Sequence, residues 1–159
     1  MEQLILKSVV NVFQYEELPT PVKLLVDSAK DATANSYSPY SQFSVGAALR
    51  LEDGTVIKGA NQENAAFPVT MCAERSAIFN AQSNFPKLAI TQIAIAARNA
   101  NGFVNEPISP CGVCRQAILE MEQRYNNDIV IYLYGTKCVY EISSIKHLLP
   151  LSFVDASMR

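Results

Sequence analysis

The stretch VGAALRLEDGTVIKGAN, residues 45–61, predicts the central element of the fold. Residues 45–51 and 54–61 are rich in apolar and β-branched side chains, a pattern that is typical of strands. Asp53-Gly54 lies between them and is a favoured pair for a tight hairpin turn. Because hairpin strands run antiparallel, a sheet that holds this hairpin beside crossover-connected strands is mixed rather than wholly parallel.

Helical and extended patterns alternate around this hairpin. Residues 20–35 place apolar side chains at helical spacing, and Pro21 suits a first helical turn. The other predicted elements are helices at 72–82, 111–125 and 143–149 and strands at 90–97, 129–135 and 137–142. Helices interleaved with strands in this order predict an α/β layered domain around one mixed sheet.

Length and composition are those of one ordinary globular domain over residues 1–159. Hydrophobic residues make up 49% of the chain and charged residues 18%. The net charge of −2 argues against binding to nucleic acid, which needs a strongly basic surface. A small nucleotide-like ligand is compatible with this charge, because it needs only a pocket.

No targeting or membrane segment is evident in the sequence. The start, MEQLILKSVVNVFQYEELP, lacks a basic leader, and no apolar run approaches the roughly 18 residues that a membrane span needs. We therefore expect a cytoplasmic protein in a reducing compartment. The four cysteines are then expected to bind metal, to act in catalysis or to be buried singly, rather than to form disulfides.

Three of the cysteines share one kind of position. Cys72 lies just before a predicted helix, and Cys111 and Cys114 lie at the start of another. The partial positive charge of a helix N-terminus favours thiolate, which is the form that binds zinc. Three thiolates leave one position of a tetrahedron open, as in catalytic zinc sites, whereas structural sites are usually closed by four protein ligands.

Cys138 and His147 are the candidates for a fourth ligand. Cys138 lies on a predicted strand, which is typical of a small buried core residue, and His147, the one histidine, is expected on a helix surface. If either residue closed the site, the protein would be a structural zinc module used for binding. A redox Cys-x-x-Cys protein is a further alternative, but it leaves Cys72 unexplained.

Glu74 lies two residues after Cys72. Residues two apart on a regular helix point to nearly opposite sides, so both can share a site only if Cys72 lies at the helix entrance. A carboxylate there can take the proton of a metal-bound water. The alternative role for Glu74 is that of a first-turn glutamate that complements the helix dipole.

The segments Cys72-Ala73-Glu74 and Pro110-Cys111-Gly112-Val113-Cys114 resemble the signature of zinc-dependent nucleobase deaminases. The blocks SYSPYSQFSVGAAL, NQENAAF, CAERSAIF, SPCGVCRQ and LLPLSF are similar to successive blocks of the cytidine deaminase family, the small homotetrameric kind that acts on free nucleosides. The resemblance covers residues 36–153 and leaves 1–19 as a variable N-terminal extension. It implies an α/β, three-layer cytidine-deaminase-like fold, in which helices flank a central mixed sheet of about five strands.

This resemblance implies hydrolytic deamination of cytidine and 2′-deoxycytidine to uridine and 2′-deoxyuridine, with release of ammonia, in pyrimidine salvage. One Zn²⁺ per chain would be held by Cys72, Cys111 and Cys114, and Glu74 would carry protons from a zinc-bound water to the base. The implied partners are a small-molecule nucleoside and further copies of the chain, in a homotetramer whose active sites are completed across subunits. Neither nucleic acid nor a membrane is expected as a partner.

The resemblance also assigns substrate contacts. Asn61 and Glu63 are two apart at a predicted strand end and so face the same side, and in the family such residues contact the ribose, chiefly its 3′-hydroxyl. Phe43 would pack on the pyrimidine ring. Backbone groups near Ala73 and Ser109 would orient the edge of the base.

Two further aromatic residues, two arginines and one glutamine complete the expected site. Phe153 would reach into a neighbouring subunit's site, and Phe67 would lie near that interface, where the family often has tyrosine. Arg75 would donate to thiolate sulfurs and offset the net −1 charge of zinc with three thiolates, unless it forms a surface salt bridge. Arg115 and Gln116 would support the metal loop. The alternative enzymes are deaminases of another aminated heterocycle, of blasticidin S type or a nucleotide.

Overall fold

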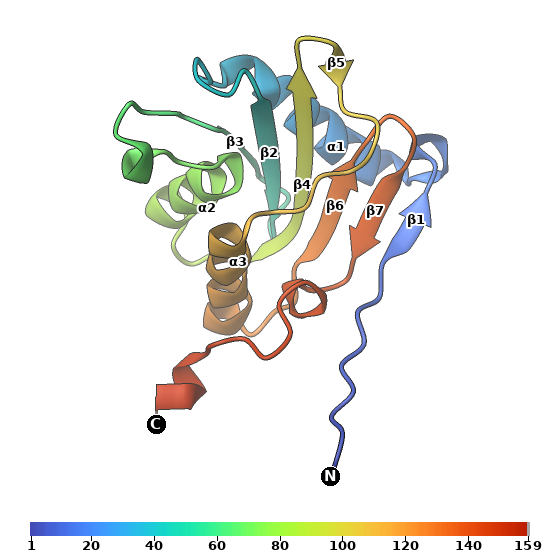
Figure 1. Ribbon diagram of the computed structural model, residues 1–159, viewed down its shortest axis with the longest axis vertical. Helices are drawn as coiled ribbons and strands as arrows, with labels where there is room; N and C mark the ends of the chain where they lie inside the picture. Colours follow the sequence, from blue (N-terminus) through green and yellow to red (C-terminus); the bar gives the residue numbers. More distant parts are fainter. Residues whose placement is uncertain (159) are drawn as a thin grey trace.

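The computed structural model describes residues 1–158, and seven strands of this part form one mixed sheet in the order β1-β7-β6-β4-β2-β3, with β5 paired to β4 (Figure 1). The strands are β1 (Asn11–Phe13), β2 (Ser44–Leu51), β3 (Val56–Ala60), β4 (Ile90–Asn99), β5 (Gly102–Phe103), β6 (Val130–Tyr134) and β7 (Val139–Ile142). The predicted mixed sheet is confirmed. The predicted count of about five was too low, because β1 and β5 are too short to show a pattern of their own.

Three α-helices and five short 3₁₀ helices accompany the sheet within the described residues. They are α1 (Thr20–Ala32), α2 (Ala73–Asn84) and α3 (Gly112–Tyr125), with η1 (Tyr15–Glu17), η2 (Thr33–Asn35), η3 (Phe67–Val69), η4 (Ile145–His147) and η5 (Asp155–Met158). The helix predicted over 20–35 thus ends as a 3₁₀ turn, and the one predicted over 143–149 is a single 3₁₀ turn. None of the helices among residues 1–158 combines the length and the apolar content that a membrane span requires.

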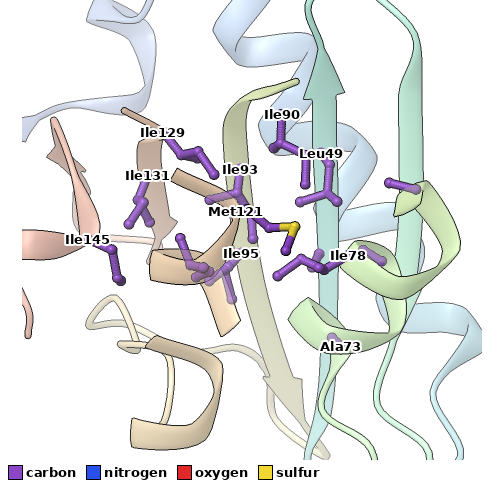
Figure 2. Packing of buried hydrophobic residues seen from close by; sticks show 14 of the residues in the cluster. Leu49, Ala73, Ile78, Ile90, Ile93, Ile95, Met121, Ile129, Ile131 and Ile145 are labelled. Carbon is purple, nitrogen blue, oxygen red and sulfur yellow. The ribbon is translucent and has the colours of Figure 1, made fainter. Parts of the chain in front are cut away.

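The helices lie on both faces of the sheet, so the α/β three-layer prediction is confirmed. Helix α1 covers one face, and α2 and α3 cover the other (Figure 1). Alternate residues of each strand point to opposite faces. Leu49 and Ile93 therefore pack under α2 and α3 (Figure 2), whereas Ala48 and Ala94 pack under α1.

The hairpin predicted from the Asp53-Gly54 turn is confirmed. Strands β2 and β3 pair antiparallel, and Gly54 in the turn has φ of 91°, a left-handed conformation that suits glycine. Strand β4 pairs in parallel with β6, and α3 lies in the connection between them. Gly59 on β3 lies so close to the backbone of α2 that a Cβ atom there would overlap Ala77. This close approach fixes α2, and with it Cys72, against the sheet.

The N-terminal extension, residues 1–19, contributes to the fold. Strand β1 pairs antiparallel with β7, and the Tyr15 hydroxyl donates to the Asp27 carboxylate on α1 at 2.7 Å. The Lys30 ammonium lies over the Tyr15 ring, 5.1 Å from its centroid. Residues 1–10, by contrast, are exposed, and the chain end runs away from the body of the molecule (Figure 1).

Candidate active site

Three cysteine sulfurs meet where α2 and α3 begin. Cys72 and Cys111 are the N-cap residues of α2 and α3, with extended backbones, and Cys114 lies in the first turn of α3. The Cys72 and Cys111 sulfurs are 3.8 Å apart, and those of Cys111 and Cys114 are 3.5 Å apart. All three ligand atoms lie within 4.8 Å of one another. The fold therefore gathers residues that are about 40 positions apart in the chain.

The spacing of these sulfurs suits a single zinc ion. A tetrahedral ion with Zn–S bonds of about 2.3 Å keeps its sulfur ligands roughly 3.8 Å apart. A thiolate-rich donor set favours zinc among the common divalent metals. The cluster found among residues 1–158 includes neither Cys138 nor His147. The protein therefore offers three ligands and leaves one position open to solvent or substrate.

The two residues outside the cluster have other surroundings. Cys138 precedes β7 and is half-buried, so it is less buried than the small core residue that the sequence predicted. His147 lies in η4, and its Nδ1 accepts a hydrogen bond from the Val9 N–H at 3.3 Å. This contact ties the N-terminal arm to η4.

The thiols of the cluster differ in acidity. The pKa of Cys72 is lowered to about 5, first because Cys114 donates to its sulfur and further because Arg75 and Cys111 lie beside it. The same interaction with Cys72, together with burial, raises the pKa of Cys114. Of these two thiols, Cys72 is therefore the one that is held as a thiolate, as its place at a helix N-terminus favours.

Arg75 lies beside the cluster, where the sequence reading placed it. Its Nη2 is 3.7 Å from the Cys72 sulfur and 3.5 Å from the Thr70 carbonyl oxygen. The thiolate raises the pKa of the guanidinium. The ion pairs found among residues 1–158 do not include Arg75, so the surface salt-bridge alternative was wrong.

Glu74 is buried in the first turn of α2, with 5% of its surface exposed. It lines the same cavity as Cys72, because Cys72 lies outside the regular helix and the two side chains need not point apart. Burial is the main reason why the pKa of the Glu74 carboxyl is raised. A carboxyl group of this kind can hold and release a proton closer to neutral pH than an exposed glutamate.

The cavity has a volume of about 190 Å³, and its lining combines Cys72 and Cys111 with polar side chains. Its lining residues are Val45, Asn61, Glu63, Thr70, Met71, Cys72, Ala73, Glu74, Ile108, Ser109 and Cys111. Seven of these were singled out from the sequence, whereas Val45, Thr70, Met71 and Ile108 were not. Ile108 and Met71 adjoin predicted residues in the chain, and that adjacency was the one signal that could have found them.

Asn61 and Glu63 also hold a loop in place. The Asn61 amide oxygen accepts from the Ser36 hydroxyl and the Val45 N–H, and its nitrogen donates to the Phe43 carbonyl. The Glu63 carboxylate accepts from two successive backbone N–H groups, those of Tyr40 and of the next residue. Both residues therefore fasten the loop 36–43 to the end of β3. The sequence did not predict that these two side chains hold the loop.

Three predicted substrate contacts lie outside this cavity. Phe43 is half-buried, and Phe153 is 61% exposed, with its carbonyl accepting from Gln116. Phe67 lines a neighbouring open hollow of about 420 Å³. Its ring packs edge-on against the Tyr40 ring, with 5.8 Å between the two ring centroids. The hollow shares Glu63 and Thr70 with the cavity, so the two adjoin each other.

Comparison with known proteins points to one family. Residues 20–131 match a family model described as "Cytidine and deoxycytidylate deaminase zinc-binding region". Cytidine deaminase of Sporosarcina psychrophila is 40% identical over 132 residues, 83% of this chain and 90% of that protein. Cytidine deaminase of Halalkalibacterium halodurans is 38% identical over 136 residues, 86% of this chain and 96% of that protein.

Solved structures give the same family. The crystal structure of cytidine deaminase from Burkholderia pseudomallei matches with a TM-score of 0.69 and 34% identity, over 82% of this chain and 97% of that chain. The crystal structure of cytidine deaminase from Mycobacterium tuberculosis matches with a TM-score of 0.66 and 29% identity, over 84% of this chain and 97% of that chain.

Proposed function

Because this chain belongs to the cytidine deaminase family, we propose that Glu74 moves the protons of its reaction while Cys72, Cys111 and Cys114 hold its zinc ion. The protein is a zinc-dependent hydrolase that deaminates cytidine to uridine and ammonia. The single observation that carries the residue roles is that Glu74, Cys72 and Cys111 line one cavity together with the polar side chains of Asn61 and Glu63. We extend the proposal to 2′-deoxycytidine, because none of the predicted substrate contacts requires a 2′-hydroxyl.

Glu74 acts as a proton carrier in this proposal. The zinc ion, when bound, supplies Lewis-acid activation of water at the open position. The Glu74 carboxylate accepts a proton from the attacking water and delivers it to ring N3 as the new C4–O bond forms. Glu74 then passes the hydroxyl proton of the adduct to the amine, the C4–N bond breaks and ammonia leaves. Its burial supports this role, because a raised pKa suits both halves of the transfer.

The other lining residues orient the nucleoside. Ala73 and Ser109 line the cavity and lie close to Cys72 and Cys111 in the chain, which suits backbone contacts to the edge of the base. Asn61 and Glu63 line the same cavity, and their polar side chains suit the hydroxyls of the sugar. The Phe43 carbonyl accepts from the Asn61 side chain, and we propose that the Phe43 ring packs on the pyrimidine when substrate binds.

The charge of the cavity favours a nucleoside over a nucleotide. Within residues 1–158, the lining residues of the cavity and of the adjoining hollow include Glu63 and Glu74 but no lysine or arginine. A 5′-phosphate placed beyond the sugar would therefore meet negative charge without a cationic partner. We expect cytidine to be a much better substrate than CMP, and a direct comparison of kcat/KM tests this preference.

We propose that the protein works as a homotetramer in the cytoplasm, with active sites completed across subunits. Exposed apolar side chains near the site support such an assembly, since Phe67 is 69% exposed and Phe153 is 61% exposed. The four free cysteines support a reducing compartment.

Glu74→Gln tests the proton-carrier role. The amide keeps the shape of the side chain but cannot carry protons, so kcat for cytidine should fall by about 10²–10⁴-fold or more. Zinc content, determined on the same sample, should stay at that of the native protein. Glu120→Gln, an exposed change on α3, is the control. Substantial turnover by zinc-loaded Glu74→Gln would show that another group moves the protons.

A further inference from the structure

Arg115 holds the backbone on both sides of Cys111. Its side-chain Nε donates to the Pro110 carbonyl oxygen at 2.9 Å, and its backbone N–H donates to the Cys111 carbonyl oxygen at 2.9 Å. Pro110 is buried, whereas Cys111 is exposed and has no side-chain cap at the start of α3. The bond to the Cys111 carbonyl is the ordinary backbone bond of the helix, whereas the bond from Nε to the Pro110 carbonyl belongs to the arginine side chain and holds the peptide that leads into Cys111.

The same guanidinium also binds the C-terminal part of the chain. Arg115 Nη1 donates to the Leu148 carbonyl oxygen at 2.6 Å. A guanidinium presents its donors in a fixed planar fork, so the Pro110 and Leu148 carbonyls are held at a set distance from each other. Arg115 thus links the metal loop, the loop that leads through Pro110 into Cys111, to a segment that is 33 positions away in sequence.

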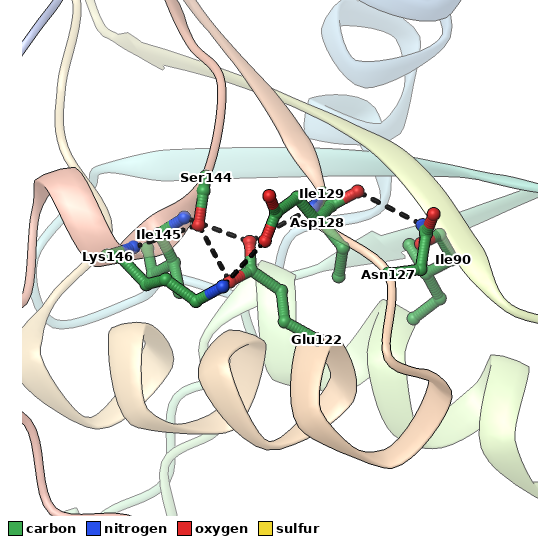
Figure 3. Close-up of polar contacts among 8 residues, drawn as sticks. All are labelled: Ile90, Glu122, Asn127, Asp128, Ile129, Ser144, Ile145 and Lys146. Atoms are coloured by element: carbon green, nitrogen blue, oxygen red, sulfur yellow. Dashed lines mark hydrogen bonds and ion pairs between the residues drawn. The ribbon is translucent and has the colours of Figure 1, made fainter.

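We call residues 144–153, which include Leu148, the C-terminal strap. Two other side chains of α3 hold its ends: Glu122 accepts from the Ser144 hydroxyl and the Ile145 N–H (Figure 3), and Gln116 donates to the Phe153 carbonyl. Arg115 binds between these two points. Of the three side chains, it is the one whose hydrogen bonds reach both the strap and the metal loop.

We infer that Arg115 is a positioning residue for the zinc site, which holds Cys111 ready for the metal and couples zinc binding to the order of the strap. The inference rests on the proposed assignment of Cys111 as a ligand. Such coupling is reciprocal: if the strap and Arg115 stabilise the zinc site, bound zinc must stabilise the strap by the same free energy.

Zinc release from Arg115→Lys is the first test. A lysine ammonium keeps the charge but cannot bind the Pro110 and Leu148 carbonyls together as a rigid planar fork. We expect zinc to pass to a chelating dye about 10–100-fold faster than from the native protein, the range known for losing a residue that orients a metal ligand. Release at the native rate would overturn the inference.

Arg124→Lys is the matched control. Arg124 lies on the same helix and binds the Gln82 side chain and the Pro86 carbonyl, away from the metal loop. The control should lose a similar amount of thermal stability and keep the native rate of zinc release. If both variants released zinc equally fast, loss of general stability would explain the effect and the positioning role would be overturned.

Hydrogen exchange on the unmodified chain gives a second test, which needs no variant to fold. On zinc removal, the strap amides of Ile145 and Leu148 should exchange at least about tenfold faster, while amides of α1 stay unchanged. Unchanged strap amides, or equal acceleration in α1, would overturn the coupling. Neither test uses a nucleoside, so failure of the proposed residue roles in catalysis would leave both readouts intact.

Discussion

Asn61 and Glu63 line the same cavity but differ in the hydrogen-bonding groups that each has left for a ligand. The Asn61 amide is largely occupied, because its oxygen has two donors and its nitrogen one acceptor within the protein. The pKa of Glu63 is lowered, first by the Ser41 hydroxyl and then by the N–H groups of Tyr40 and Ser41, so the residue stays a carboxylate down to acid pH. Glu63 is therefore the stronger candidate for a sugar hydroxyl, and Asn61 chiefly holds the loop.

Glu63→Gln should lower kcat/KM for cytidine by on the order of tenfold, because a hydrogen bond to an ionised acceptor is stronger than one to a neutral amide. The loop should stay in place, since glutamine can still accept from the Tyr40 and Ser41 N–H groups. With 3′-deoxycytidine, which lacks the hydroxyl in question, the variant and the native protein should differ little. Steady-state kinetics on both substrates measures this coupling. An equal loss on the two substrates would place the effect of Glu63 elsewhere than the 3′-hydroxyl.

At the scale of elements, Glu122 joins α3 to both strands beyond it. Its carboxylate is 3% exposed and accepts from the Ile129 N–H before β6 and from the Ser144 hydroxyl and Ile145 N–H after β7 (Figure 3). A buried carboxylate is stable when its oxygens are satisfied in this way. The position of α3, and so of its cysteines, depends on this contact.

Glu122→Ala should lower the free energy of unfolding by about 3–5 kcal/mol, because it leaves three buried donors without an acceptor. Glu120→Ala, an exposed change on the same helix, should alter it by no more than about 0.5 kcal/mol. Urea denaturation of both variants measures the difference. A loss below about 1 kcal/mol for Glu122→Ala would mean that water replaces the carboxylate.

The elements that the sequence predicted are those with a local signal. The Asp53-Gly54 turn and the helix starts at Cys72 and Cys111 are visible in a few neighbouring residues, and they were enough to bring the three cysteines together. Strand β1 has no such signal, because it is three residues long and pairs with β7 about 130 positions away. The places of Phe43 and Phe153 outside the cavity depend on how loops pack, which periodicity does not encode.

At the scale of the whole molecule, the cavity looks incomplete within one chain. It is open beside the hollow of Phe67, and Phe153 does not line the cavity of its own subunit. The Phe153 carbonyl is bound to Gln116 on α3, which keeps the exposed ring at the surface. An exposed ring at this place is compatible with the role across subunits that we propose for it.

Subunit mixing tests this arrangement. Glu74→Gln removes the proton carrier of its own site, and Phe153→Ala removes the ring given to a neighbour, so each variant alone should be a poor enzyme. In mixed tetramers, a Phe153→Ala subunit keeps its Glu74 and can receive Phe153 from a Glu74→Gln neighbour. In an equal, random mixture, half of the sites keep Glu74 and half of those receive the ring, so roughly a quarter of native activity should return. Co-expression with two affinity tags yields the mixed tetramers for a cytidine assay. Activity no higher than the mean of the two parents would show that Phe153 acts within its own subunit or not at all.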